Sequence, residues 1–134
     1  MFETMTAIHA AALYCGLLIG LMLVLKFYVG WRRGVLNVAS GDVSNPEFAR
    51  AGRVQMNAVE DVPVLLVGIV VLALLGMPVW YVHMTGGLLV VSRIIHAIGL
   101  GRTGGTSINR LAGTLGTTLV YLAVAGALIV HAFV

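Results

Sequence analysis

Five polar residues stand directly before one of the most apolar runs of the chain. Arg53, Gln55, Asn57, Glu60 and Asp61 occupy the stretch RVQMNAVED, and VPVLLVGIVVLALLGM overlaps its end. Charged and amide groups are costly in a bilayer, so a cluster of this kind usually has partners and a function. Guanidinium groups suit anions, because they donate parallel hydrogen bonds to a carboxylate or a phosphate.

The spacing of these residues predicts which of them act together. Arg53, Asn57 and Glu60 follow each other at i, i+4 and i+7, so they share one face of a helix. Arg93 and His96, at i and i+3 of a later apolar segment, are expected at the same depth. We predict an ion pair between Glu60 and Arg93, because either charge left alone would cost about 2.5–3.5 kcal/mol. One interpretation is therefore that the cluster only holds the helices together.

The chain has more arginines than its acidic residues can pair with. Four further arginines are expected at one membrane face: Arg32, Arg33, Arg53 and Arg110. The acids left to balance them are Asp42, Glu47 and Asp61. A surplus of arginine at one depth indicates an external anion. For Arg32 and Arg50, anchoring at the lipid headgroups is the open alternative.

The elements that must position these residues are membrane helices. The chain has 134 residues, of which 60% are hydrophobic and only 10% charged, and its mean hydropathy is +1.03. A membrane-spanning helix needs roughly 20 apolar residues. Four segments qualify: about 7–31, 54–77, 80–101 and 108–133. Because they use most of the chain, residues 1–134 are predicted to form a single all-α integral membrane domain, a bundle of four transmembrane helices.

The basic residues predict the orientation of this bundle. All eight lie at or between the first and second segments or around the link between the third and fourth. The positive-inside rule makes both links cytoplasmic and puts both termini outside. The start, MFET, lacks the positive charge of a signal peptide, so we expect the first helix to be retained. The net charge of +3 is too small for nucleic-acid binding.

Other chemistries have little support in the sequence. Cys15 is the single cysteine, which excludes an intrachain disulfide and favours packing inside a helix. His9, His83 and His131 have no metal-ligand spacing, so no metal site is predicted. Neither a phosphate-binding glycine loop nor a Ser-His-Asp pattern is recognisable.

Four segments together resemble the MAPEG family, the membrane-associated proteins of eicosanoid and glutathione metabolism. They are WRRG, NPEFARAGRVQMNAVEDVP, SRIIHAIGL and Arg110, in this order over nearly the whole chain. The resemblance is greatest to small bacterial members, which implies a multi-pass protein of the bacterial inner membrane. It also implies a homotrimer that binds glutathione between subunits at the cytoplasmic side, with membrane lipids and a lipophilic small-molecule substrate as further partners.

The resemblance assigns roles residue by residue. Glutathione would be the thiol co-substrate, held by Arg32, Arg53, Gln55, Asn57 and Glu60, with Arg93 and His96 beside it. Arg110 would face the sulfur and stabilise the thiolate, and Arg33 is the second candidate for that catalytic role. Many members have tyrosines where this chain has Asp61, His96 and Leu100, and some have histidine at the position of His96.

Three functions follow from these observations. The first is a glutathione-dependent transferase or peroxidase that acts on lipophilic electrophiles. The second is a non-catalytic MAPEG-like protein that binds a lipid or a partner protein at the same groove between subunits, which the missing tyrosines favour. The third is a small transporter that uses Glu60 or Asp61 as a proton-coupled site.

Overall fold

Four long helices make up the protein in the computed structural model, which describes residues 6–39, 44–102 and 107–134. The helices are α1 (Ala7–Val35), α2 (Pro46–Leu74), α3 (Val79–Arg102) and α4 (Ile108–His131). Each is long and apolar enough to cross a membrane. The predicted all-α bundle of four transmembrane helices is therefore confirmed. Asp42, named above as an acid that could balance the arginines, lies outside the described residues, as do the first five residues.

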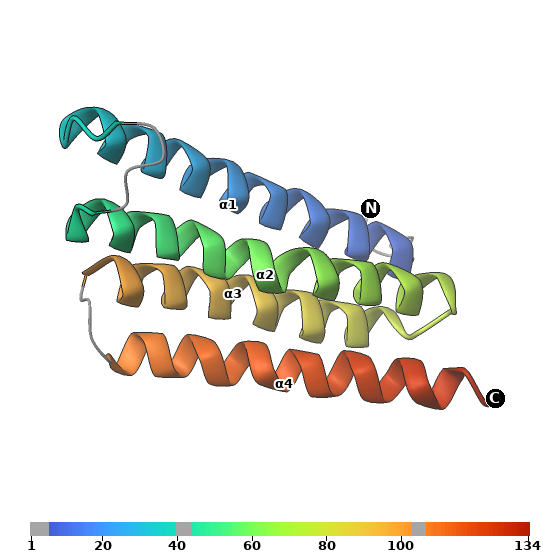
Figure 1. The fold of residues 1–134 in the computed structure, drawn as a ribbon. Coiled ribbons are helices and arrows are strands. Elements are labelled where there is room, and N and C mark those ends of the chain that lie inside the picture. The colour runs from blue at the N-terminus through green and yellow to red at the C-terminus, as the bar shows by residue number, and fades with distance from the viewer. Residues whose placement is uncertain (1–5, 40–43, 103–106) are drawn as a thin grey trace.

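The helices run alternately up and down, so both chain ends lie at one end of the bundle (Figure 1). α1 packs on α2 and α3, and α4 packs on α3 and α2. The other end carries the last turn of α1, the first turn of α2, the last turn of α3 and the first turn of α4. We call it the arginine end, because Arg32, Arg33, Arg50, Arg102 and Arg110 lie there.

Large apolar side chains cover the outside of the bundle as well as its inside. Leu18, Ile69, Leu89 and Val120 are fully buried where the helices meet. Outward-facing residues are also apolar, and Phe27 of α1 is 70% exposed. Water would not tolerate so large an apolar surface, whereas lipid tails solvate it without penalty. The apolar outer surface is thus that of a lipid-embedded bundle.

Helix α2 begins eight residues before the predicted start at residue 54. The side chain of Asn45 accepts hydrogen bonds from the backbone N–H groups of Glu47 and Phe48, at 3.0 and 3.1 Å. Pro46 takes the first helical position, where its missing N–H costs nothing, and Glu47 suits the positive end of the helix dipole. The segment NPEF therefore starts the helix and does not belong to the loop before it.

The other end of α2 is also earlier than predicted. The helix ends at Leu74, three residues before the expected limit, because Gly76 has a φ of 83°. Its neighbours close the last turn, with the N–H of Gly76 bonded to the carbonyl of Ala73 and that of Met77 to the carbonyl of Leu72. This is the left-handed cap that glycine adopts at low cost.

Glycine also sets the distance between α3 and α4. Gly113 and Gly116 of α4 are buried against Ser92 and His96 of α3. A Cβ atom at Gly113 would lie 2.7 Å from the carbonyl oxygen of Ser92, which is too close for any real side chain. These small residues of α4 thus allow close helix packing. This contact fixes the position of Arg110, one turn before Gly113.

Candidate functional site

A cavity of about 250 Å³ opens near the arginine end, between α2, α3 and α4. We call it the arginine cavity, and it is lined by Arg53, Met56, Asn57, Glu60, Leu100 and Arg110. The spacing of Arg53, Asn57 and Glu60 places all three on one face of α2, as predicted. Arg110 comes from the first turn of α4, where the Ser107 hydroxyl accepts a hydrogen bond from the Arg110 backbone N–H at 3.2 Å.

A second cavity of about 300 Å³ adjoins the arginine cavity and extends toward the start of α2. It is lined by Pro46, Ala49, Arg50, Arg53 and Leu100, so Arg53 and Leu100 belong to both. Among the described residues, neither Arg50, Arg53 nor Arg110 forms a salt bridge, and Glu60 is the only acid in either lining. The two cavities together thus have three guanidinium groups and one carboxylate, an excess of positive charge that attracts anions.

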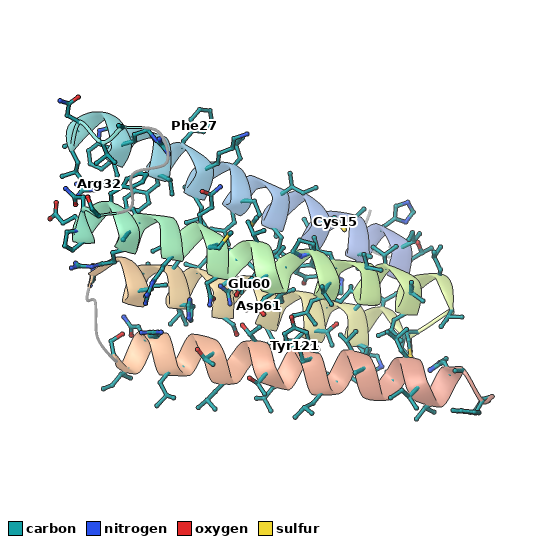
Figure 2. The ribbon with its side chains drawn as sticks, in the orientation of Figure 1. Cys15, Phe27, Arg32, Glu60, Asp61 and Tyr121 are labelled. Atoms are coloured by element: carbon teal, nitrogen blue, oxygen red, sulfur yellow. The ribbon has the colours of Figure 1, made fainter. Side chains whose placement is uncertain are left out.

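Arg93 pairs with Asp61 and not with Glu60, so the predicted Glu60–Arg93 ion pair is wrong. The Nη1 atom of Arg93 lies 2.9 Å from Oδ2 of Asp61. The reason is the angle between neighbouring helix positions, about 100° per residue. It turns Asp61 toward α3 and α4 and leaves Glu60 exposed on the cavity face, although both lie near the middle of the bundle (Figure 2).

A hydrogen-bond network surrounds this ion pair. Arg93 is 2% exposed, and its Nη2 atom donates to Oδ1 of Asn57 at 2.6 Å. The hydroxyl of Tyr121, from α4, donates to the other carboxylate oxygen of Asp61 at 3.0 Å. Hydrogen bonds from α2, α3 and α4 therefore converge on one ion pair, which has no net charge. Asp61 adds no net negative charge to the arginine cavity, because Arg93 balances it.

The same network fixes the orientation of Asn57. Arginine can only donate hydrogen bonds, so the Asn57 atom that it meets is the amide oxygen. The Asn57 amide nitrogen is then the atom left to bind another group, and it is a donor. Asn57 thus contributes a second kind of anion-binding or carbonyl-binding group to the arginine cavity, next to the guanidinium groups of Arg53 and Arg110.

A smaller polar cavity of about 120 Å³ lies deeper in the bundle. It is lined by Asn57, Asp61, Arg93, Thr114, Thr117, Thr118 and Tyr121, so Asn57 separates it from the arginine cavity. The three threonine hydroxyls each donate to a backbone carbonyl four residues earlier, at 2.9 Å. Their remaining lone pairs make this space rich in hydrogen-bond acceptors.

The two arginines at the end of α1 have contacts of their own. Arg32 forms a salt bridge with Glu47 at 3.0 Å, and the guanidinium of Arg33 stacks on the ring of Phe48, 4.9 Å from its centre. Both contacts join α1 to the first turn of α2. Neither arginine lines the arginine cavity of its own chain.

Two other predicted site residues also lie outside that cavity lining. His96 is 3% exposed, packed against Gly113 between α3 and α4, and its Nδ1 atom has no hydrogen-bond partner among the described residues. Gln55 is half-buried on α2, two residues from Arg53 and therefore turned well away from the cavity face. Within one chain, the structure groups Arg53, Asn57, Glu60 and Arg110 around the arginine cavity. Arg93 lies outside its lining and donates a hydrogen bond to Asn57 from α3.

Tyr121 and the threonines of α4 are site residues that were not predicted from the sequence. A signal for them exists in the spacing, because Gly113, Thr117 and Tyr121 follow each other at intervals of four residues. That spacing puts all three on one helix face. Since Gly113 must face a neighbouring helix closely, Tyr121 must point into the bundle as well.

Comparisons with known proteins agree with this architecture. The sequence model of the MAPEG family matches residues 11–130. The inner membrane protein YecN of Escherichia coli strain K12 is 34% identical over 89 residues, which are 66% of this chain and 68% of YecN. YecN of Escherichia coli O6:H1 matches to the same extent. No solved structure matches significantly.

Proposed function

The chain belongs to the MAPEG family of multi-pass membrane proteins, and we propose that it is a glutathione-dependent transferase or peroxidase for lipophilic electrophiles. One observation carries the proposal: the arginine cavity is lined by Arg53, Asn57, Glu60 and Arg110, and the adjoining cavity adds Arg50. Glutathione has two carboxylates, two peptide amides, one amine and one thiol, and this cavity offers a partner for each kind of group.

The charges of the cavity fit the two ends of this peptide. Arg50 and Arg53 suit carboxylates, because a guanidinium pairs with a carboxylate through two parallel hydrogen bonds. Glu60 suits the amine, and the Asn57 amide nitrogen suits a peptide carbonyl. Asp61 does not oppose binding, since its charge is balanced by Arg93 at 2.9 Å. Leu100 supplies only an apolar contact.

Arg110 is the residue that we assign to the sulfur. A free thiol has a pKa of about 8.5, so only a few per cent is the nucleophilic thiolate at neutral pH. Arg110 lies in the first turn of α4, where the positive end of the helix dipole adds to the guanidinium charge. Both favour the thiolate. Its sulfur then displaces a leaving group from an electrophilic carbon, or attacks the terminal oxygen of a hydroperoxide, where the O–O bond breaks as the S–O bond forms. The second reaction releases the alcohol and the sulfenic acid of glutathione, which a second glutathione reduces to the disulfide with loss of water.

The membrane delivers the second substrate. The helices around the arginine cavity have apolar side chains on their outer, lipid-facing surfaces. A lipophilic electrophile dissolved in the bilayer therefore reaches the sulfur by diffusion. We further propose the orientation and assembly that the charge distribution and the family suggest. The arginine end is cytoplasmic, as the positive-inside rule requires. The chain is a homotrimer, in which Arg32 and Arg33 of a neighbouring subunit complete the site.

The proposal is tested with the Arg110→Ala variant, a chloronitrobenzene and cumene hydroperoxide. We expect the variant to lose most of its turnover with either electrophile while its Kd for glutathione, measured by calorimetry, changes little. Such a split identifies an interaction that acts in the transition state. Equal losses in turnover and in binding would show that Arg110 only holds the peptide.

A second candidate function rests on Leu100, which lines the cavity where many family members have a tyrosine. A leucine cannot donate a hydrogen bond to a sulfur or a peptide group. In this alternative the protein binds a lipid or a partner protein at the same groove without catalysis. Wild-type protein that binds glutathione but forms no thiolate and converts neither electrophile would support it.

A further inference from the structure

A groove of about 480 Å³ runs along the opposite side of the bundle, between α1 and α3. Its floor is Val54 of α2, and its walls include Leu21 and Leu25 of α1 and Ile94 and Ile98 of α3. The arginine cavity lies between α2, α3 and α4, so the two sites open on different faces. The candidate thiol site leaves this groove unused.

Both walls of the groove become polar at the same end. Helices α1 and α3 run in the same direction, so their C-terminal parts both lie at the arginine end (Figure 1). On α1 the lining passes from Leu21 to Tyr28, and on α3 from Ile94 to Arg102. These steps of seven and eight residues correspond to about 10 and 12 Å along the helix axes. The groove is therefore parallel to the membrane normal, with its cationic end at the membrane surface.

Aromatic residues mark the level of that surface. Trp31 is 61% exposed, and its ring centre lies 6.3 Å from that of Tyr28. Exposed Trp and Tyr side chains sit at the lipid headgroups. Arg102 is exposed in the last turn of α3 and, within the described part of the chain, has no salt-bridge partner. Its guanidinium is available at the depth of a lipid phosphate.

We propose that this groove binds one acyl chain of an anionic phospholipid from the leaflet at the arginine end, with the lipid headgroup on Arg102. The order of groups in the groove is that of a phospholipid, from a charged head at the surface to a chain in the interior. A free anion such as inorganic phosphate would satisfy Arg102 but leave the apolar walls uncovered. A lipid with no net charge would fill the walls without balancing the arginine.

Gly101 gives the groove its width near the headgroup. A Cβ atom at this position would meet only Val54, at 4.0 Å, so a larger side chain fits without a clash but occupies the space of the lipid chain. Ala97, one turn deeper, lines the same groove. Gly101→Leu and Ala97→Leu are therefore two independent ways to block the groove while leaving Arg102 in place.

Native mass spectrometry from detergent micelles tests the proposal, with phosphatidylglycerol or phosphatidylcholine of identical chains as the probe. We expect one tightly retained phosphatidylglycerol per chain, bound about fivefold better than phosphatidylcholine, since one arginine near the surface contributes about that factor. Arg102→Gln should abolish the preference, and Gly101→Leu and Ala97→Leu should remove the bound lipid. Inorganic phosphate should not compete.

Matched variants separate this site from unspecific lipid contact. Lys26→Gln removes an exposed positive charge from α1, and Gly30→Leu adds bulk where nothing lies within 4 Å, and neither residue lines the groove. Both should retain the lipid like the wild type. An unchanged preference in Arg102→Gln, or a lipid that stays bound in both blocked variants, would overturn the proposal. Circular dichroism establishes that each variant remains folded.

Discussion

The ion pair between Arg93 and Asp61 makes a sharp prediction, because the neighbouring acid Glu60 provides a natural control. Replacing Asp61 by Asn keeps the shape of the side chain but leaves the Arg93 guanidinium, 2% exposed, without a counter-charge. Removing one partner of a buried pair costs about 3–5 kcal/mol. Since the Asp61 side chain is 26% exposed, we expect the lower part of that range, about 3 kcal/mol. Glu60→Gln, which touches no buried charge, should change stability by less than about 0.5 kcal/mol.

The assay is reversible unfolding in mixed micelles with increasing SDS, followed by circular dichroism. A double-mutant cycle with Arg93→Met isolates the pair from other effects. The double variant should be more stable than the sum of the two single changes predicts, by about 1–3 kcal/mol. Tyr121→Phe, which removes one donor from the Asp61 carboxylate, should cost about 1 kcal/mol. If Glu60→Gln were as destabilising as Asp61→Asn, or if the cycle were additive, the assignment of the pair would be refuted.

Three further predictions concern the site and the helices that position it. Arg53→Gln should weaken glutathione binding in calorimetry about 10- to 100-fold, because a hydrogen bond to a charged group contributes about 1.5–3 kcal/mol. An unchanged Kd would exclude contact between this residue and the peptide. Gly116→Val should lower the unfolding free energy by about 1–3 kcal/mol through overpacking against α3, whereas Gly126→Val, with nothing within 4 Å, should leave it unchanged. Asn45→Ala should cost about 1 kcal/mol by removing the cap of α2, and a fully stable variant would contradict the capping role.

The sequence predicts the four helices well because their signal is physical and local. A run of about 20 apolar residues has few alternatives to a membrane helix, since lipid offers no partners for an open backbone. The start of α2 was missed because Asn45 and Pro46 are also common in turns, and the same residue types serve as a helix cap. Only the backbone geometry distinguishes the two uses.

Side chains on one helix were easier to predict than pairs between helices. The grouping of Arg53, Asn57 and Glu60 on one face of α2 follows from the helical repeat alone. The partner of Arg93 does not, because Glu60 and Asp61 are adjacent in sequence and a rotation of α2 by one residue exchanges them. Close packing at Gly113 and Gly116 fixes α4 against α3, and α2 then presents Asp61 to both Arg93 and Tyr121.

The central claim is that the arginine cavity binds glutathione and turns it into a thiolate. The most direct test is a titration of the purified wild-type protein with glutathione, in which the ultraviolet absorbance of the thiolate is followed at neutral pH. We predict a saturable rise in thiolate absorbance, which is absent with S-methylglutathione because its sulfur has no proton to lose. If glutathione produced no more absorbance than its S-methyl form at any concentration, the cavity would not be a thiolate site and the proposed chemistry would be contradicted.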